Sequence, residues 1–227
     1  VVDTEHKLII AHEVTNAPVD RCQLSAMATL AQEALQVEEL TVLADRGYYK
    51  GEEMRACNLA GIKALVPKTQ TSGNTAAGLF EKENFCYDKA LDQYRCPAGE
   101  TLPRRHSTVE RGMTMHGYYT STLVCEACTL RSKCTRGKAR RIKRWEHEGV
   151  LDGMEEQLQR KPDAMAMRSC TVEHPFGTIK TWMGYSHFLT RRLKNVRTEM
   201  SLHVLAYNLR RMISIMGVAP LMEAIRA

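Results

Sequence analysis

Long apolar runs are absent from this sequence of 227 residues. The longest, such as residues 8–11 and 64–66, are far too short to cross a bilayer, so we expect no membrane association. Residues 1–7 also lack the basic and then apolar pattern of a secretory signal, which favours a cytoplasmic protein. No G-x-S-x-G motif or paired Ser and His signature is present, and this argues against a metabolic α/β hydrolase.

Cysteine is well represented, but without a sign of secretion its eight residues do not indicate disulfides. Four of them have the spacing of ligands for tetrahedral Zn²⁺, including one C-x₂-C pair: Cys96, Cys125, Cys128 and Cys134. The interval before the pair is longer than in compact zinc fingers, so ordinary buried thiols are the competing interpretation. Cys86, His106 and His116 are alternative ligands. Three further cysteines have apolar surroundings and are expected in the core: Cys22, Cys57 and Cys170.

Positive charge is concentrated in two stretches of a chain whose net charge is only +6. Residues 131–144 read RSKCTRGKARRIKR, with eight basic residues and no acid, and a second basic stretch covers residues 180–197. Either stretch alone is compatible with a solvated basic face. Because the two flank one candidate acid, we expect them to contact a phosphate backbone.

Apolar periodicity in the first third of the chain predicts an α/β layered domain. The expected elements are two short strands within residues 1–16, a helix over 23–36, a strand over 40–44, a helix over 52–60 and a strand over 62–66. Asp20 is the expected cap of the first helix, and Gly61 is expected to end the second. The expected buried stripe of the first helix consists of Leu24, Met27, Leu30, Ala31 and Leu35.

The composition changes twice further along the chain. Residues 69–78 are small and polar, as in a linker, and a Cys- and Tyr-rich region follows up to residue 144. Helices are then expected over residues 146–160 and 198–216. We therefore predict three parts: 1–78 and 146–227 as pieces of one core, and 79–145 as an insertion. Four tyrosines are expected to build the core of the insertion rather than to stack on bases: Tyr87, Tyr94, Tyr118 and Tyr119.

Two carboxylates are candidates for catalysis. Asp45 directly follows a predicted buried strand, at the edge of the sheet where α/β proteins bind their ligands, and Gly47 lets the chain turn away. Pro175 suits the first turn of a helix, which would put Glu173 at the helix entrance and Lys180 two turns further along the same face. Taken singly, Asp45 is better explained as a turn former, and Glu173 as ordinary helix electrostatics.

The motifs taken together carry a resemblance to a known family. LADRGYY, then VEHPFGTIK, then Glu199 and AYNLRR (residues 206–211) resemble the insertion-sequence DDE transposases, in the branch with a Cys-rich insertion between the last two acids. The resemblance implies a ribonuclease-H-like mixed sheet with flanking helices, interrupted by that insertion. It makes Asp45 the second catalytic acid, Glu173 the third and Lys180 a contact for DNA phosphate.

The same resemblance leaves two positions unmatched. The family's first catalytic Asp lies on the opening strand, which we expect before Val1, so the chain is interpreted as a carboxy-terminal fragment that is inactive alone. Asp3 belongs to the next strand and is not assigned to the catalytic set. A basic residue is expected four positions before Glu173, where Ser169 stands; Arg168, one position further back, is the candidate for this DNA contact.

The implied activity is cleavage and strand transfer at transposon ends, acting on terminal inverted repeats and target DNA. Two Mg²⁺ or Mn²⁺ ions about 4 Å apart would be held by the carboxylates, since hard cations prefer oxygen ligands. We expect a homodimer in the DNA complex, associated with the nucleoid. The insertion is expected to grip transposon-end DNA through Arg140, Arg141, Lys143 and Arg144. The alternative is a non-enzymatic, zinc-stabilised DNA-binding remnant, in which the two acids would not converge.

Three further side chains beside Glu173 are given structural roles. His174 is expected to pack against neighbouring groups rather than to act as a general base, because two-metal chemistry does not require one. Phe176 and Trp182 are expected in the core.

Overall fold

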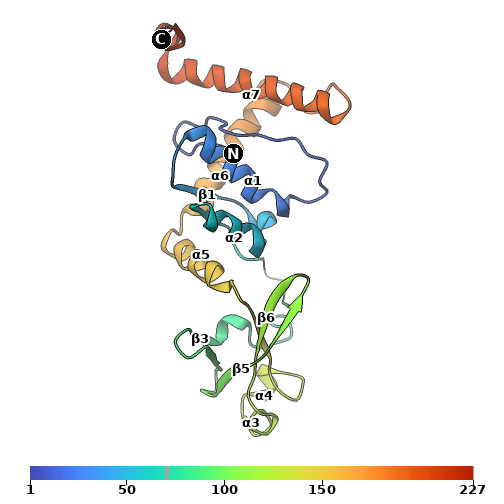
Figure 1. Ribbon diagram of the computed structural model, residues 1–227. Coiled ribbons are helices and arrows are strands. Elements are labelled where there is room, and N and C mark those ends of the chain that lie inside the picture. Colours follow the sequence, from blue (N-terminus) through green and yellow to red (C-terminus); the bar gives the residue numbers. More distant parts are fainter. Residues whose placement is uncertain (70–71, 227) are drawn as a thin grey trace. The chain divides into compact units, whose positions relative to one another are not determined.

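A computed structural model describes residues 1–69 and 72–226 of the chain (Figure 1). The chain forms two compact units. The split unit consists of Val1–Thr69 together with the chain from Val150 onward, and the middle unit consists of the residues between them. Residues 70 and 71 of the predicted linker lie outside the described residues, and residues 74–78 form a turn. No helix in the described part is long and apolar enough to span a membrane.

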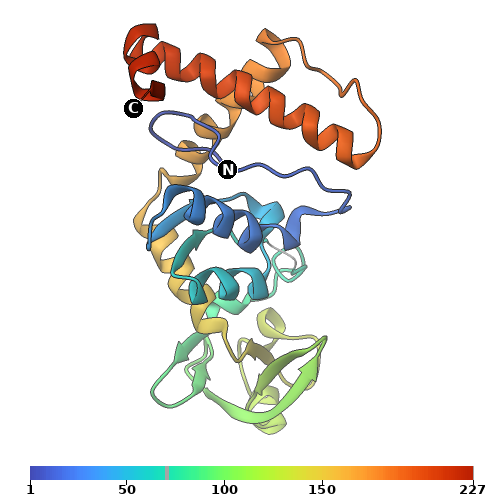
Figure 2. The same cartoon turned by 45° about the horizontal axis from the view of Figure 1, so that its top comes forward.

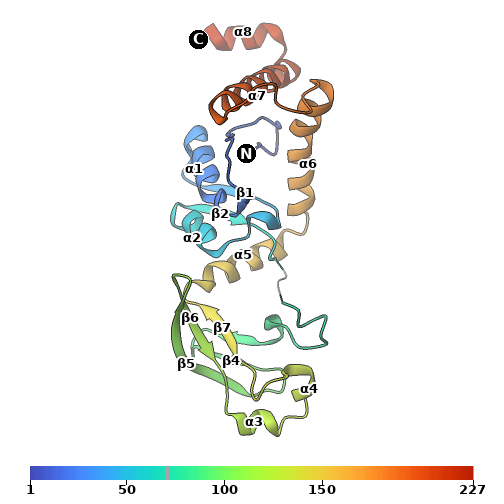
Figure 3. The same cartoon turned by 90° about the vertical axis from the view of Figure 1, so that its right-hand side faces the viewer.

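The split unit is built on two parallel strands, β1 (Leu40–Leu43) and β2 (Ile62–Leu65), paired in register from Leu40 with Ile62 onward. Both predicted strands and the helix between them, α2 (Gly51–Leu59), are confirmed. Gly61 follows this helix with φ of 73°, a left-handed conformation that glycine adopts without strain. Helices α1 (Leu24–Leu35) and α2 lie on one side of the strands, and α6 (Ala164–Gly177) lies on the other (Figure 3).

The predicted details of α1 are wrong in two respects. Asp20 does not cap the helix, because residues Asp20–Cys22 form a separate 3₁₀ turn, η1, and Gln23 occupies the cap position. The buried stripe is Leu24, Ala28 and Ala31, whereas Leu30 and Leu35 are 44% and 43% exposed. The two alanines of this i, i+4, i+7 stripe allow α1 to lie close to α2, and Leu30 and Leu35 lie outside the stripe.

The core of the split unit also includes a helix from the second half of the chain. Met154 of α5 (Glu148–Arg160) is buried among residues of α1, α2 and the two strands. Leu151 and Leu158 of the same helix pack against this cluster at its edge. Residues far apart in sequence therefore share one core.

The amino-terminal segment does not form the two strands expected from its apolar pattern. A turn at residues 4–6 joins two extended stretches that share a single antiparallel bridge, Val2 with Ile9. The backbone groups of Ile9 are bound instead by the side-chain amide of Asn208, with both distances 2.9 Å. A helix side chain thus takes the hydrogen bonds that a neighbouring strand would otherwise make.

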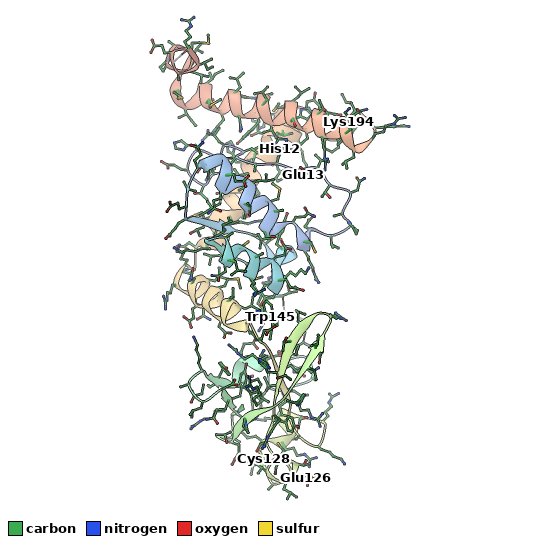
Figure 4. The ribbon with its side chains drawn as sticks, viewed as in Figure 1. His12, Glu13, Glu126, Cys128, Trp145 and Lys194 are labelled. Carbon is green, nitrogen blue, oxygen red and sulfur yellow. The ribbon has the colours of Figure 1, made fainter. Side chains whose placement is uncertain are left out.

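Asn208 lies on α7 (Leu193–Met216), the 24-residue helix that crosses this segment (Figure 2). The Tyr207 hydroxyl donates to the Lys7 carbonyl at 2.6 Å, and Arg211 Nε donates to the His6 carbonyl at 2.6 Å. The AYNLRR motif therefore holds the amino-terminal hairpin, that is, the two extended stretches joined by the turn at residues 4–6. Further along, His12 and Glu13 approach the first turns of α7 (Figure 4), where Glu13 pairs with Arg197. After Gly217, α8 (Val218–Arg226) turns back.

Helix α6 starts nine residues earlier than Glu173, so the prediction that Glu173 stands at a helix entrance is wrong. Good helix formers follow Asp163, and the Met167 amide already bonds the Asp163 carbonyl at 2.8 Å. Pro175 lies inside the helix, where its missing N–H interrupts the hydrogen-bond ladder. The chain widens directly afterwards into a π-helical segment, η4 (Thr178–Trp182), so Lys180 is not on the α-helical i+7 face of Glu173.

The middle unit contains a five-stranded antiparallel sheet in sequence order. Its strands are β3 (Cys86–Asp88), β4 (Gln93–Arg95), β5 (Thr101–Glu110), β6 (Met113–Tyr118) and β7 (Ile142–Trp145). Two short helices, α3 (Thr122–Glu126) and α4 (Arg131–Cys134), lie between β6 and β7 in sequence. The protein is thus of mixed α/β class with two separate sheets, and the ribonuclease-H-like arrangement stays a prediction.

Aromatic side chains fill the core of the middle unit, as predicted for three of the four tyrosines. Tyr94 and Tyr118 are buried, and the ring of Tyr87 packs against both at centroid distances of 5.0 and 6.1 Å. Asp92 accepts hydrogen bonds from the hydroxyls of Tyr87 and Tyr118. Burial and these hydrogen bonds to a carboxylate raise the pKa of Tyr118, so both phenols stay protonated donors.

Candidate functional site

Asp45 stands two residues beyond the carboxyl end of β1. The Ala44 amide still bonds the Leu65 carbonyl at 3.1 Å, so the parallel pairing continues up to the acid. Asp45 then caps the 3₁₀ turn η2 (Arg46–Tyr48) by accepting the Gly47 amide at 2.9 Å. A Cβ atom at position 47 would lie 3.0 Å from Asp45 Oδ1, so a larger residue would require the carboxylate to shift slightly.

The second oxygen of Asp45 faces α6. Arg168 Nη2 lies 2.7 Å from Asp45 Oδ2, in an ion pair whose side chains are 26% and 47% exposed, respectively. Arg168, the candidate DNA contact, therefore meets the candidate acid within the split unit. The partial exposure of the pair leaves the carboxylate accessible to solvent and to a cation.

Glu173 lies on the same helix as Arg168. Its Oε1 accepts a hydrogen bond from the Ser169 hydroxyl at 2.6 Å, one turn earlier on the same face. Five residues separate Arg168 from Glu173, which corresponds to about 7.5 Å along an α-helix and about 140° around it. Helix α6 thus carries both Arg168, the partner of Asp45, and Glu173, the other candidate acid. No contact joins Asp45 and Glu173 directly, and their convergence on a cation stays a prediction.

His174 is exposed on α6, but its ring contacts Tyr207 of α7, with 6.1 Å between the ring centroids. Its Nδ1 lies 2.8 Å from the Tyr207 hydroxyl, which donates its proton to the Lys7 carbonyl. The histidine must therefore be the donor in this pair. Burial, with the positive charges of Arg211 and Lys7, lowers the pKa of His174, so the ring is neutral near pH 7. These contacts agree with the expected packing role.

The segment after α6 is more exposed than predicted. Phe176 and Trp182 are 53% and 77% exposed, so their expected place in the core is wrong. Within the π-helical segment η4, Ile179 is the buried residue. Lys180 is exposed, with Nζ 5.7 Å from the centre of the Phe176 ring.

Glu199 is a structural residue that sequence reasoning treated only as part of a motif. This buried carboxylate accepts the amides of Leu189 and Thr190 at 2.8 and 2.9 Å and the Thr190 hydroxyl at 2.5 Å. The hydroxyl hydrogen bond, followed by the amides, lowers its pKa to about 2. The i, i+4 pair with His203 on α7 was the available signal for a buried ionic position.

The four predicted zinc ligands meet in the middle unit. Cys96 lies in the β4–β5 turn, Cys125 in α3, Cys128 just after it (Figure 4) and Cys134 at the end of α4. All four line one cavity of about 30 Å³. Burial raises the pKa of Cys134, the other three thiols raise it further, and Arg140 opposes them.

The described residues do not form a finished metal site. As the side chains stand, no three His, Cys, Asp or Glu groups in the described ranges are close enough to hold an ion. The alternative ligands Cys86, His106 and His116 do not line the cavity. Of the thiols expected in the core, Cys57 is buried, and burial raises its pKa to about 11. Cys22 and Cys170 are exposed, because one lies in the turn before α1 and the other on the outer face of α6, so their predicted burial is wrong.

Each of the four basic side chains that are predicted to contact DNA in the middle unit has a partner inside this unit. Arg144 is only 8% exposed and lies 3.8 Å from the centre of the Tyr87 ring, so a phosphate would reach it only if this packing opened. Arg141 lies over the Tyr119 ring at 5.3 Å, and Lys143 pairs with Glu110. Arg140 donates hydrogen bonds to the carbonyls of Cys134 and Phe80. The DNA contacts of these four residues stay a prediction.

Comparison with known proteins gives one family. The model of the transposase DDE domain matches residues 95–213, a little more than half of the chain. The match contains Glu173, Lys180 and all four cysteines of the cavity, whereas Asp45 lies before it. Neither curated proteins nor solved structures gave a significant match. The chain belongs to the transposase DDE domain family, a family of DNA nucleases and strand transferases that use divalent metal ions.

Proposed function

We propose that this protein is a DNA transposase that cleaves and joins phosphodiester bonds at transposon ends, with Asp45 and Glu173 as two of its metal-binding carboxylates. The observation that carries the proposal is the link between them. Asp45 follows the carboxyl end of β1 and pairs with Arg168, on the helix that carries Glu173. The strand end and the helix thereby place both acids in one unit.

The donor set suits a hard divalent cation. Asp45 uses one hydrogen bond on each oxygen, and Glu173 has one from Ser169, so both carboxylates retain free lone pairs. Bound Mg²⁺ or Mn²⁺ would neutralise charge on the scissile phosphate and activate the attacking oxygen. Ser169 fixes the orientation of Glu173, while Arg168 and the exposed Lys180 supply positive charge for the phosphates.

The test measures the affinity for Mn²⁺. The proton relaxation rate of water reports the bound ion, so that weak binding is also detected. Asp45→Asn and Glu173→Gln should each weaken binding at least about tenfold, because each removes a charged oxygen ligand. Glu33→Gln, on an exposed face of α1 in the same unit, is the matched control and should have no effect.

Two results would contradict the shared site. If only one of the two acid variants weakened Mn²⁺ binding, the carboxylates would not share a cation. If neither did so while DNA binding persisted, the non-enzymatic binder would be the better interpretation. Under the proposal, cleavage of transposon-end DNA should be lost in both Asp45→Asn and Glu173→Gln.

The proposal includes a structural zinc centre at Cys96, Cys125, Cys128 and Cys134. It is supported by their common cavity and by the turn that presents Cys96, in which the Gly99 amide bonds the Cys96 carbonyl at 2.8 Å. Zn²⁺ requires four sulfur atoms at about 2.3 Å. The thiols must therefore rotate inward when they bind the ion.

The proposal also includes a homodimer formed through α7. Apolar residues at alternating spacings of three and four follow one side of this helix: Leu202, Leu205, Leu209, Met212 and Met216. Leu202 and Leu205 are each 61% exposed, although they belong to a helix whose opposite face is packed. This spacing is that of a two-helix seam. The flanking residues Ser201, Ala206 and Ile213 carry no charge that would repel a second copy.

A further inference from the structure

Arg140 is held more firmly than an ordinary surface arginine. Its Nη1 donates to the Cys134 carbonyl at 3.3 Å, and its Nη2 donates to the Phe80 carbonyl at 3.0 Å. The guanidinium carbon lies 5.4 Å from the centre of the Phe85 ring. These three contacts fix the plane of the guanidinium and leave little freedom for a contact with DNA.

One donor of this side chain is unused. Among the described residues, Arg140 Nε is a buried nitrogen without a hydrogen-bond partner. A buried N–H of a charged group is costly when it is unpaired, so its position calls for an acceptor. Arg140 lines the same cavity as the four cysteines, and its positive charge acts on the Cys134 thiol.

We propose that Arg140 Nε donates an N–H···S hydrogen bond to a thiolate of the cysteine metal centre, with Cys134 as the acceptor. This inference rests on the zinc centre proposed above. A thiol is a weak acceptor, whereas the thiolate formed on metal binding is a strong one, so the bond forms when the ion binds. Arg140 is then a positioning residue of the metal centre.

Charge balance supports the same assignment. Four thiolates around one Zn²⁺ leave two negative charges in a cavity that is partly closed to water. Arg131 and Arg140 are the two cationic side chains that line it, and together they offset most of this charge and of the further negative charge of Glu100. Glu100 also lines the cavity and is the competing acceptor for Arg140 Nε.

The experiment uses Co²⁺ as the probe, because its absorption bands report thiolate ligation. The affinity is measured by competition with a chelator. Arg140→Gln should weaken Co²⁺ binding about 10- to 100-fold, as is typical when a partner of a metal ligand is lost. Arg140→Lys keeps the charge without the fork and should recover only part of the affinity. Arg141→Gln, on the neighbouring arginine outside the cavity, is the matched control.

The outcomes distinguish a failure of the proposed zinc centre from a failure of the proposed role of Arg140. If the wild-type protein shows no thiolate bands, the zinc centre itself is wrong. If it shows them and Arg140→Gln behaves like Arg141→Gln, only the role of Arg140 is overturned. If Glu100→Gln abolishes the effect of Arg140→Gln, the acceptor is the carboxylate, and the proposed sulfur bond is also wrong.

A second measurement is made on the wild-type protein, and a variant is used only to assign the signal. The Arg140 Nε–H signal in a ¹⁵N spectrum, assigned by its loss in Arg140→Lys, should shift when Cd²⁺ is added and should then exchange slowly with solvent. A signal unchanged by Cd²⁺, in a protein whose thiolate–Cd²⁺ absorption shows that the ion is bound, would overturn the N–H···S bond.

Discussion

Single side chains in this protein fix the backbone of neighbouring segments through hydrogen bonds. Glu199 uses both carboxylate oxygens to hold the backbone of Leu189 and Thr190, and it thereby anchors the segment between η4 and α7. That segment follows Lys180, the candidate phosphate contact. The ionised form of Glu199 is the better acceptor, so the fold of this region is coupled to its protonation.

This coupling predicts a dependence of stability on pH. The pKa of Glu199 is lowered from 4.5 to about 2 in the folded protein, so its contribution to stability is fully present above pH 4.5 and is lost as the pH falls toward 2. Glu199→Gln should therefore destabilise the protein at pH 6 and lose less stability than the wild type between pH 4.5 and 2. Urea unfolding at several pH values measures this difference. Parallel curves for the two proteins would contradict it.

At the scale of elements, helix α7 organises the carboxy-terminal part of the split unit. One face of α7 binds the amino-terminal hairpin through Tyr207, Asn208 and Arg211, and its beginning carries Glu199. The family motif AYNLRR therefore has a structural reason. Its polar side chains provide the hydrogen bonds that the hairpin backbone lacks.

The hydrogen bonds from Asn208 to the backbone of Ile9 clamp the hairpin onto α7, and their removal should loosen it. Asn208→Ala leaves the amide and carbonyl of Ile9 without their partner in a partly buried place, which costs about 1–3 kcal/mol. Urea unfolding should show this loss, and hydrogen exchange at the Ile9 amide should accelerate. Asn195→Ala, at an exposed position in the first turn of the same helix, is the control. Equal stability of the two variants would contradict the clamp.

The elements that were predicted correctly are those with a strong local pattern. The strands β1 and β2 and the intervening α2 are bounded by their own turns, and Gly61 marks the end of α2. The prediction of two strands in the amino-terminal segment was wrong because the backbone there is bound by a side chain almost 200 residues away. The prediction for the start of α6 was wrong because proline is typical of a first helical turn, whereas Pro175 here lies inside a helix that begins at Ala164.

The same distinction applies to the candidate site. The position of Asp45 after a strand follows from local sequence, and the structure shows it there. Its pairing with Arg168 depends on packing between segments 123 residues apart, which no local pattern contains. The cavity shared by the four cysteines was expected from their spacing, whereas the unpaired nitrogen of Arg140 had no signal in the sequence.

For the whole molecule, the central fact is that the split unit is discontinuous in sequence. Its core joins residues of the first 66 positions to Met154, and the middle unit is inserted between them. Closing a longer loop adds only slowly to the entropic cost, so an insertion of this size is compatible with a stable core.

The exposed side of α7 predicts self-association of the protein. Leu205→Glu combined with Leu209→Glu should weaken the dimer at least about tenfold, because two charges would be buried in an apolar seam. Leu59→Glu, which alters a leucine that is 73% exposed on α2, is the control. Sedimentation equilibrium over a range of concentrations measures the change. The same molar mass for wild type and double variant at every concentration would contradict the seam.

The distance in sequence between the hairpin and its clamp has a consequence during translation. Ile9 leaves the ribosome 199 residues before Asn208. At about 5–20 residues per second, its backbone waits roughly 10–40 s for this partner. The segment around Ile9 is thus synthesised long before the helix that binds it, and a message broken between the codons for Ile9 and Asn208 yields a chain in which the backbone of Ile9 lacks this partner.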